Sequence, residues 1–134
     1  AMAHYSKGKT LGIFKNNKQL GLALDKFNQL IREYPVSNKI DESAFYAGRI
    51  YEMFGDYSIA ATYYQRAFQW NPKIDYPARY RAALVYDWKL KRRHEALALY
   101  QEALALDPIT EANREYIEER ILVMSSPDFP ENEN

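Results

Sequence analysis

The stretch Ala44–Pro72, AFYAGRIYEMFGDYSIAATYYQRAFQWNP, contains the pattern that decides the fold. In its second half Ala60, Tyr64 and Ala67 stand at i, i+4 and i+7, the spacing of the apolar stripe on an amphipathic helix. Pro72 then ends that helix, because the proline ring clashes with the preceding helical turn. This half of the stretch therefore predicts one helix with a single buried face.

The first half predicts a partner helix. Four of its residues share one face by helical spacing, and three of them are small: Ala44, Ala47, Gly48 and Tyr51. Gly55 and Asp56 follow and are expected to supply a turn and the N-cap of the next helix. Small residues opposite an aromatic residue let two helices approach closely, so the stretch predicts an antiparallel helical hairpin.

The same pattern occurs three times in the chain. In each copy an alanine is followed four residues later by an aromatic residue and twelve residues later by a proline. The three alanines are Ala23, Ala60 and Ala96, and the prolines that follow them are almost evenly spaced. Because one hairpin cannot cover its own apolar face, the repetition predicts hairpins stacked side by side.

The repeated unit resembles the tetratricopeptide repeat. The middle unit matches that family's consensus at Ala47, Gly48, Tyr51, Gly55, Asp56, Tyr57, Ala60, Tyr64, Ala67 and Pro72. The third unit matches at Ala82, Ala83, Tyr86, Ala96, Tyr100, Ala103 and Pro108, and has one extra residue that we place in the turn from Lys89 to Arg93. The first unit keeps Phe14, Ala23, Phe27, Leu30 and Pro35. The tyrosines at consensus packing positions are expected in the core: Tyr51, Tyr64, Tyr86 and Tyr100.

The resemblance implies an all-α fold, an α-α superhelix (solenoid) of three helical hairpins followed by a C-terminal capping helix. We expect residues 4–124 to form this domain, with repeats near 4–37, 41–74 and 76–109. The closing helix is expected over 110–124, with Thr110 as its N-cap. Residues 1–3 resemble a vector scar. Residues 125–134 have two prolines and no helical period, so we expect a flexible tail.

Composition and charge argue against several classes of function. Eighteen basic and eighteen acidic residues cancel, so no nucleic-acid partner is expected. No apolar run approaches the roughly 20 residues of a transmembrane helix. The chain has no cysteine, and its two histidines are not at metal-ligand spacing. Without a phosphate-binding loop or a nucleophile motif we expect no catalytic residue, no metal and no cofactor, and we predict that the chain is not an enzyme.

Two charged segments have ordinary explanations. The basic run Lys89–His94 is expected to be a solvated connector between helices. In the closing helix, Arg114 and Arg120 stand among glutamates and are expected to form local ion pairs on a solvated face.

In the tetratricopeptide family the first helix of each repeat lines the concave side, so the resemblance places candidate partner-binding residues there. They are Phe45, Tyr46, Arg49, Glu52 and Met53 in the middle unit, and Tyr80, Arg81, Leu84, Asp87 and Trp88 in the third. Aromatic residues with arginine are the composition that contributes most at protein interfaces. The alternative is that these side chains pack against neighbouring helices.

The resulting hypothesis is a non-catalytic scaffold that holds a peptide or protein partner in the concave groove. Two alternatives stay open: a self-assembly module in which a second copy fills the same surface to give a homo-oligomer, or a regulatory fragment of a larger multidomain protein. The link Tyr34-Pro35-Val36-Ser37 adds a weaker resemblance to bacterial envelope proteins such as outer-membrane assembly lipoproteins and the Tol-Pal-associated coordinator. The compartment, cytoplasm or bacterial periplasm and cell envelope, stays undecided.

Overall fold

The computed structural model describes residues 21–22, 25, 28–29 and 39–130. The chain divides into two units, Ala1–Ser37 and Asn38–Asn134, and the fold described below is that of the second. The predicted first repeat, residues 4–37, falls almost entirely outside the described residues. Within the described part of the chain, no helix is both long and apolar enough to cross a membrane.

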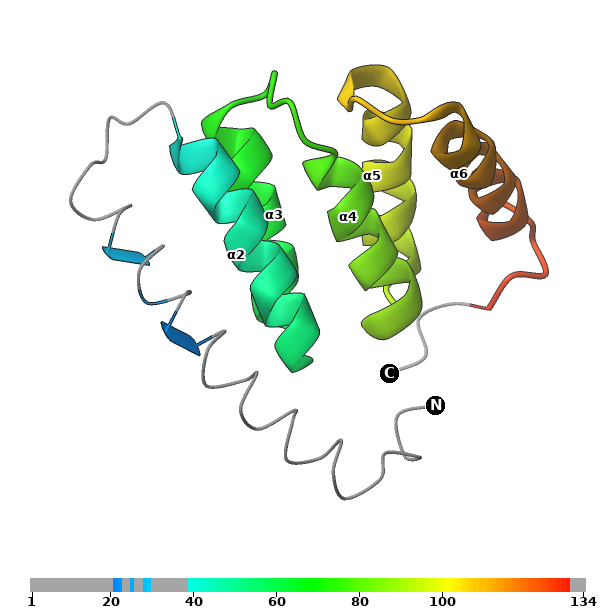
Figure 1. Ribbon diagram of the computed structural model, residues 1–134. Coiled ribbons are helices and arrows are strands. Elements are labelled where there is room, and N and C mark those ends of the chain that lie inside the picture. The colour runs from blue at the N-terminus through cyan, green and yellow to red at the C-terminus, as the bar shows by residue number, and fades with distance from the viewer. Residues whose placement is uncertain (1–20, 23–24, 26–27, 30–38, 131–134) are drawn as a thin grey trace. The chain divides into compact units, whose positions relative to one another are not determined.

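The second unit is all-helical over residues 39–130, which confirms the predicted fold class (Figure 1). Its elements are α2 (Ile40–Phe54), α3 (Tyr57–Trp70), α4 (Ala78–Leu84), a π-helical turn (Val85–Lys89) that continues α4, α5 (Arg93–Leu106) and α6 (Glu111–Met124). α2 with α3 and α4 with α5 make two hairpins, and α6 packs on α5. Figure 1 shows α2 and α4 on one side of these hairpins and α3 and α5 behind them.

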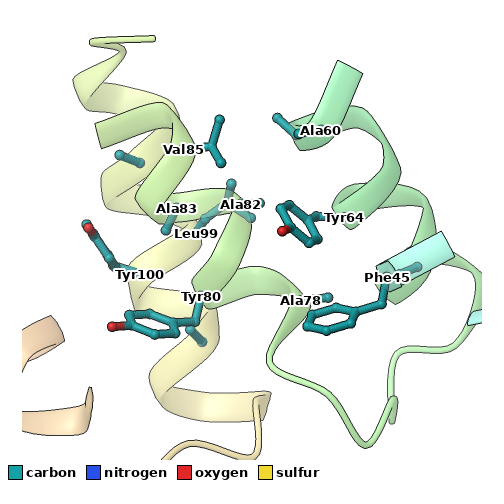
Figure 2. Close-up of a cluster of buried hydrophobic side chains, with 14 of the residues drawn as sticks. Phe45, Ala60, Tyr64, Ala78, Tyr80, Ala82, Ala83, Val85, Leu99 and Tyr100 are labelled. Carbon is teal, nitrogen blue, oxygen red and sulfur yellow. The ribbon is translucent and has the colours of Figure 1, made fainter. Parts of the chain in front are cut away.

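The predicted packing positions form the core. Ala60, Tyr64 and Ala67 of α3 are fully buried, as are Ala96, Tyr100 and Ala103 of α5. Figure 2 shows Tyr64 of α3 and Ala82 of α4 pointing toward one another, so the two hairpins share one interior.

The prediction that four tyrosines lie in the core is right for Tyr64 and Tyr100 and wrong for Tyr51 and Tyr86, which are only partly buried. Tyr51 stacks on Tyr63 with ring centroids 5.3 Å apart, and the Tyr86 hydroxyl accepts a hydrogen bond from Gln65 Nε2 at 3.0 Å. These side chains pack with an apolar ring inside and keep a polar end near the surface.

The turn of the first hairpin and the start of α6 largely agree with the residues expected to form them. Gly55 adopts φ 84, a conformation that glycine reaches without strain, and its N–H donates to Glu52 O. Thr110 caps α6 by accepting a bond from the Asn113 N–H. Asp56 occupies the N-cap position of α3, but its side chain makes no capping hydrogen bond, so that part of the expectation is wrong.

The extra residue of the third unit lies inside the helix and not in the following turn. The Leu90 N–H donates to Val85 O, the i to i+5 bond that defines a π turn. Lys91, with φ 56, then occupies the left-handed position that Gly55 has in the first hairpin. A π turn takes up one residue without breaking the helix. Asp87 and Trp88 therefore stand on this turn.

Candidate binding surface

The ten candidate residues lie on α2 and on α4 with its π turn, but they differ in exposure. Arg49, Met53 and Trp88 are exposed, whereas Phe45, Tyr80 and Asp87 are buried. The remaining four, Tyr46, Glu52, Arg81 and Leu84, are partly buried.

Phe45 and Tyr80 belong to the interior of the unit. The Phe45 ring stacks on Tyr76 with centroids 5.1 Å apart and lies 5.5 Å from the Tyr64 ring. The Tyr80 hydroxyl donates to Asn113 Oδ1 of α6 at 3.3 Å. Both side chains therefore offer almost no surface to another molecule.

Asp107 holds the start of α4. Its Oδ2 accepts the Tyr80 N–H at 2.8 Å, and its Oδ1 accepts Arg79 Nη1 at 3.1 Å. Burial raises the pKa of this carboxyl above its ordinary value, against the opposing effect of these hydrogen bonds. The bonds join the end of α5 to the first turn of α4, which fixes the helix that carries the third-unit candidates.

Glu52 is the centre of a polar cluster that joins three helices. The Tyr64 hydroxyl of α3 donates to Glu52 Oε1 at 2.7 Å. Arg81 of α4 donates from Nη2 to both Glu52 oxygens, at 3.2 and 3.3 Å. The ion pair joins α4 to α2, and these two helices lie on the same side of the two hairpins (Figure 1).

Asp87 repeats this arrangement one hairpin later. The Tyr100 hydroxyl of α5 donates to Asp87 Oδ2 at 2.7 Å, and Arg120 of α6 donates from Nε and Nη2 at 2.9 and 2.8 Å. In both hairpins a buried tyrosine binds a carboxylate of the first helix, and an arginine of the next helix neutralises it. We call these the Glu52 cluster (Glu52, Tyr64, Arg81) and the Asp87 cluster (Asp87, Tyr100, Arg120).

The two clusters give several of the candidate binding residues a role inside the unit. The carboxylates of Glu52 and Asp87 already accept hydrogen bonds from side chains inside the unit. The expectation that Arg120 pairs with glutamates on its own helix is wrong, because its guanidinium reaches Asp87 instead. The sequence did hold a signal for this: a carboxylate follows directly after the consensus aromatic residue of each first helix, Glu52 after Tyr51 and Asp87 after Tyr86.

The buried tyrosines predict a loss of stability in alkali. Burial, and then the hydrogen bonds to the carboxylates, raise the pKa of Tyr64 and of Tyr100 well above the ordinary value of 10.0. In the unfolded chain both hydroxyls ionise near pH 10, so stability is fully present below that pH and falls as the pH rises towards the folded-state values. Each tyrosine should cost about 1.4 kcal/mol per pH unit in this range. Urea unfolding at several pH values between 9 and 11 should show a shallower decline for Tyr100→Phe than for the wild type, and equal declines would contradict the assignment.

Three exposed side chains remain on the face made by α2 and α4. Arg49 and Met53 stand one helical turn apart on α2, and Met53 is 62% exposed. Trp88 is 46% exposed, and its Nε1 donates to the Tyr116 hydroxyl of α6 at 2.7 Å. Arg120 covers one side of the Trp88 ring at 4.5 Å from its centroid. Trp88 is therefore held in one orientation while part of its ring stays open.

Most of the basic run Lys89–His94 is exposed, as expected, but it is not all connector, because α5 begins at Arg93. The Lys89 ammonium lies 5.3 Å from the Tyr57 ring centroid and that of Lys91 lies 5.7 Å from the Trp88 ring centroid. Arg93 is partly buried. Across the residues that the structure describes, no group of three or more histidine or acidic side chains could hold a metal ion.

The sequence was compared with models of known protein families. A family model described as tetratricopeptide repeat matches residues 42–74 and 76–110, which together are just over half of the chain. The two matched segments correspond to the α2–α3 and α4–α5 hairpins. No curated protein matches the sequence.

Proposed function

Because this chain belongs to the tetratricopeptide repeat family, we propose that the face made by α2 and α4 binds an extended segment of a partner protein. Repeats of this family are generally protein–protein interaction modules, and stacked helical repeats present extended concave surfaces. The observation that carries the proposal is the exposure of Arg49, Met53 and Trp88 on one face whose carboxylates are already neutralised.

The chemistry of the three side chains defines what such a segment must offer. Met53 and the open part of Trp88 favour apolar side chains, because burial of their exposed area on binding is favourable. Arg49 favours a carboxylate or a main-chain carbonyl. Glu52 cannot compete for Arg49, since Arg81 and Tyr64 already occupy it.

Replacing Arg49 by alanine should weaken binding of such a segment at least tenfold, about 1.4 kcal/mol or more, because a central arginine is a frequent energetic anchor. The ligands are extended peptides selected on the wild-type protein by display, and affinity is measured by fluorescence anisotropy. Arg66→Ala on α3 is the matched control, since Arg66 is also exposed but lies on the second helix of its hairpin.

Two outcomes would overturn the proposal. Selected peptides that bind Arg49→Ala and Met53→Ala as tightly as the wild type would show that the face is not the site. A stable dimer in sedimentation experiments that dissociates on Arg49→Ala substitution would favour the self-assembly alternative, in which a second copy fills this face.

A further inference from the structure

A pocket of about 220 Å³ lies where the end of the second hairpin meets the segment that follows α6. Its walls include Trp88, Lys91, Arg93, Arg120, Phe129 and Pro130. The pocket shares Trp88 with the face made by α2 and α4, so a bound segment could extend from that face into the pocket.

The segment after α6 packs against this pocket and does not simply run away from the helices. The Phe129 N–H donates to Ser126 O at 3.1 Å, which turns the chain back. Arg93 Nη1 then donates to Phe129 O at 3.0 Å. This last bond recognises main chain, so it is available to any segment that adopts the same path.

An aromatic ring already lies close to two guanidinium groups there. The Phe129 ring centroid is 5.7 Å from the Arg93 guanidinium carbon and 5.8 Å from that of Arg120. Cations favour the face of an aromatic ring at such distances. Phe129 is only partly buried, and it forms one wall beside the open volume.

The charges of the pocket and of the segment are complementary. The lining has three cationic side chains, Lys91, Arg93 and Arg120, and one carboxylate, Asp87, which offsets the charge of Arg120, so its formal net charge is +2. Residues 125–134 carry three acidic residues and no basic one. The pocket therefore suits an aromatic side chain with carboxylates close to it in sequence.

We propose that this pocket receives an acidic partner segment carrying an aromatic residue, and that Asp128–Pro130 occupies its edge as an internal substitute for that segment. The inference names the chemistry of the partner and so rests on the proposed function. A tethered segment competes at a high effective concentration, so removing its aromatic residue should raise the affinity for a free ligand. The C-terminal segment thereby limits access to the pocket.

The test uses a fluorescein-labelled peptide with the sequence of residues 125–134, SSPDFPENEN, amidated at its end. The full chain carrying Phe129→Ala should bind this peptide at least tenfold more tightly than the wild type does. The same peptide with alanine in place of its phenylalanine should not bind. Phe129→Leu, which keeps an apolar side chain without an aromatic face, should also bind more tightly than the wild type, and circular dichroism of each variant confirms that the helices are retained.

Charge reversal tests the basic wall. In the Phe129→Ala background, Lys91→Glu should lower the affinity for the peptide at least tenfold. Lys73→Glu in the α3–α4 loop should leave this affinity unchanged. The indole N–H signals of the two tryptophans locate the site: that of Trp88 should shift on binding, and that of Trp70, which is exposed at the end of α3, should not.

Equal affinity of the wild type and Phe129→Ala, binding that survives Lys91→Glu, or no binding to Phe129→Ala at millimolar peptide would each overturn the inference. Arg66→Ala should leave the affinity for this short peptide unchanged, because Arg66 is not part of the pocket. Failure of the experiment with Arg49→Ala and selected peptides would contradict the proposed binding face. Failure of the experiment with the labelled peptide would contradict the proposed ligand of the pocket, so the failures of the two proposals are distinguishable.

Discussion

Replacing Asp87 by alanine should lower the free energy of unfolding by about 3 to 5 kcal/mol, the usual result of removing one partner of a buried ion pair. The side chains of Asp87 and Arg120 are 4% and 15% exposed, so the arginine would keep its charge in a largely dry site. The Tyr100 hydroxyl would also lose its acceptor inside the core.

The Glu52 cluster provides the matched control. Its ion pair has side chains that are 26% and 30% exposed, so water screens it and compensates for the lost partner. Glu52→Ala should therefore cost less, about 2 kcal/mol, mainly because the buried Tyr64 hydroxyl also loses its acceptor. Urea unfolding of both variants decides the matter: an equal cost would mean that the burial of Asp87 does not matter. Removing both charges together, as Asp87→Leu with Arg120→Met, should recover part of the loss.

The second large effect is expected at Gly48. A Cβ atom at this position would lie 2.7 Å from two ring carbons of Tyr64, closer than real Cβ atoms come to their neighbours. The ring cannot withdraw, because it is fully buried and its hydroxyl is bound to Glu52. Gly48→Leu should therefore lower the free energy of unfolding by about 3 kcal/mol, at the upper end of overpacking costs.

A double variant separates overpacking from any other effect of the leucine. In a Tyr64→Ala background the space occupied by the ring is free, so Gly48→Leu should cost much less than it does in the wild type. Thermal and urea unfolding of the four proteins give the coupling between the two positions. Additive costs would show that the contact with Tyr64 is not the cause.

The helices and their hairpins could be predicted because their signals are local. Apolar spacing, a proline after each second helix, Gly55 and Thr110 act within a few residues of where they stand. The position of the extra residue could not be predicted, since comparing the repeats with one another shows that the third unit has one more residue before its second helix but not which helical turn widens to take it.

For the candidate surface, the sequence could predict only which helix face the residues share. Helical spacing indicates which residues of α2 and α4 share a face, but it does not show what reaches that face from elsewhere. Arg81 and Arg120 come from later helices and convert two candidate binding carboxylates into internal contacts. Two prolines in residues 125–134 predict a tail, whereas the packing of Phe129 on Arg93 depends on a contact between residues 36 positions apart.

The order of the partners in the two clusters has a consequence for a chain growing on the ribosome. Glu52 is synthesised 29 residues before Arg81, and Asp87 is synthesised 33 residues before Arg120. Each of the two hairpins therefore carries an unneutralised carboxylate until the helix that follows it has been made. Nascent chains halted within either interval should be cleaved by proteases more readily than chains halted after the following helix has been made. The reason is that each carboxylate is neutralised only when the arginine of that helix is present.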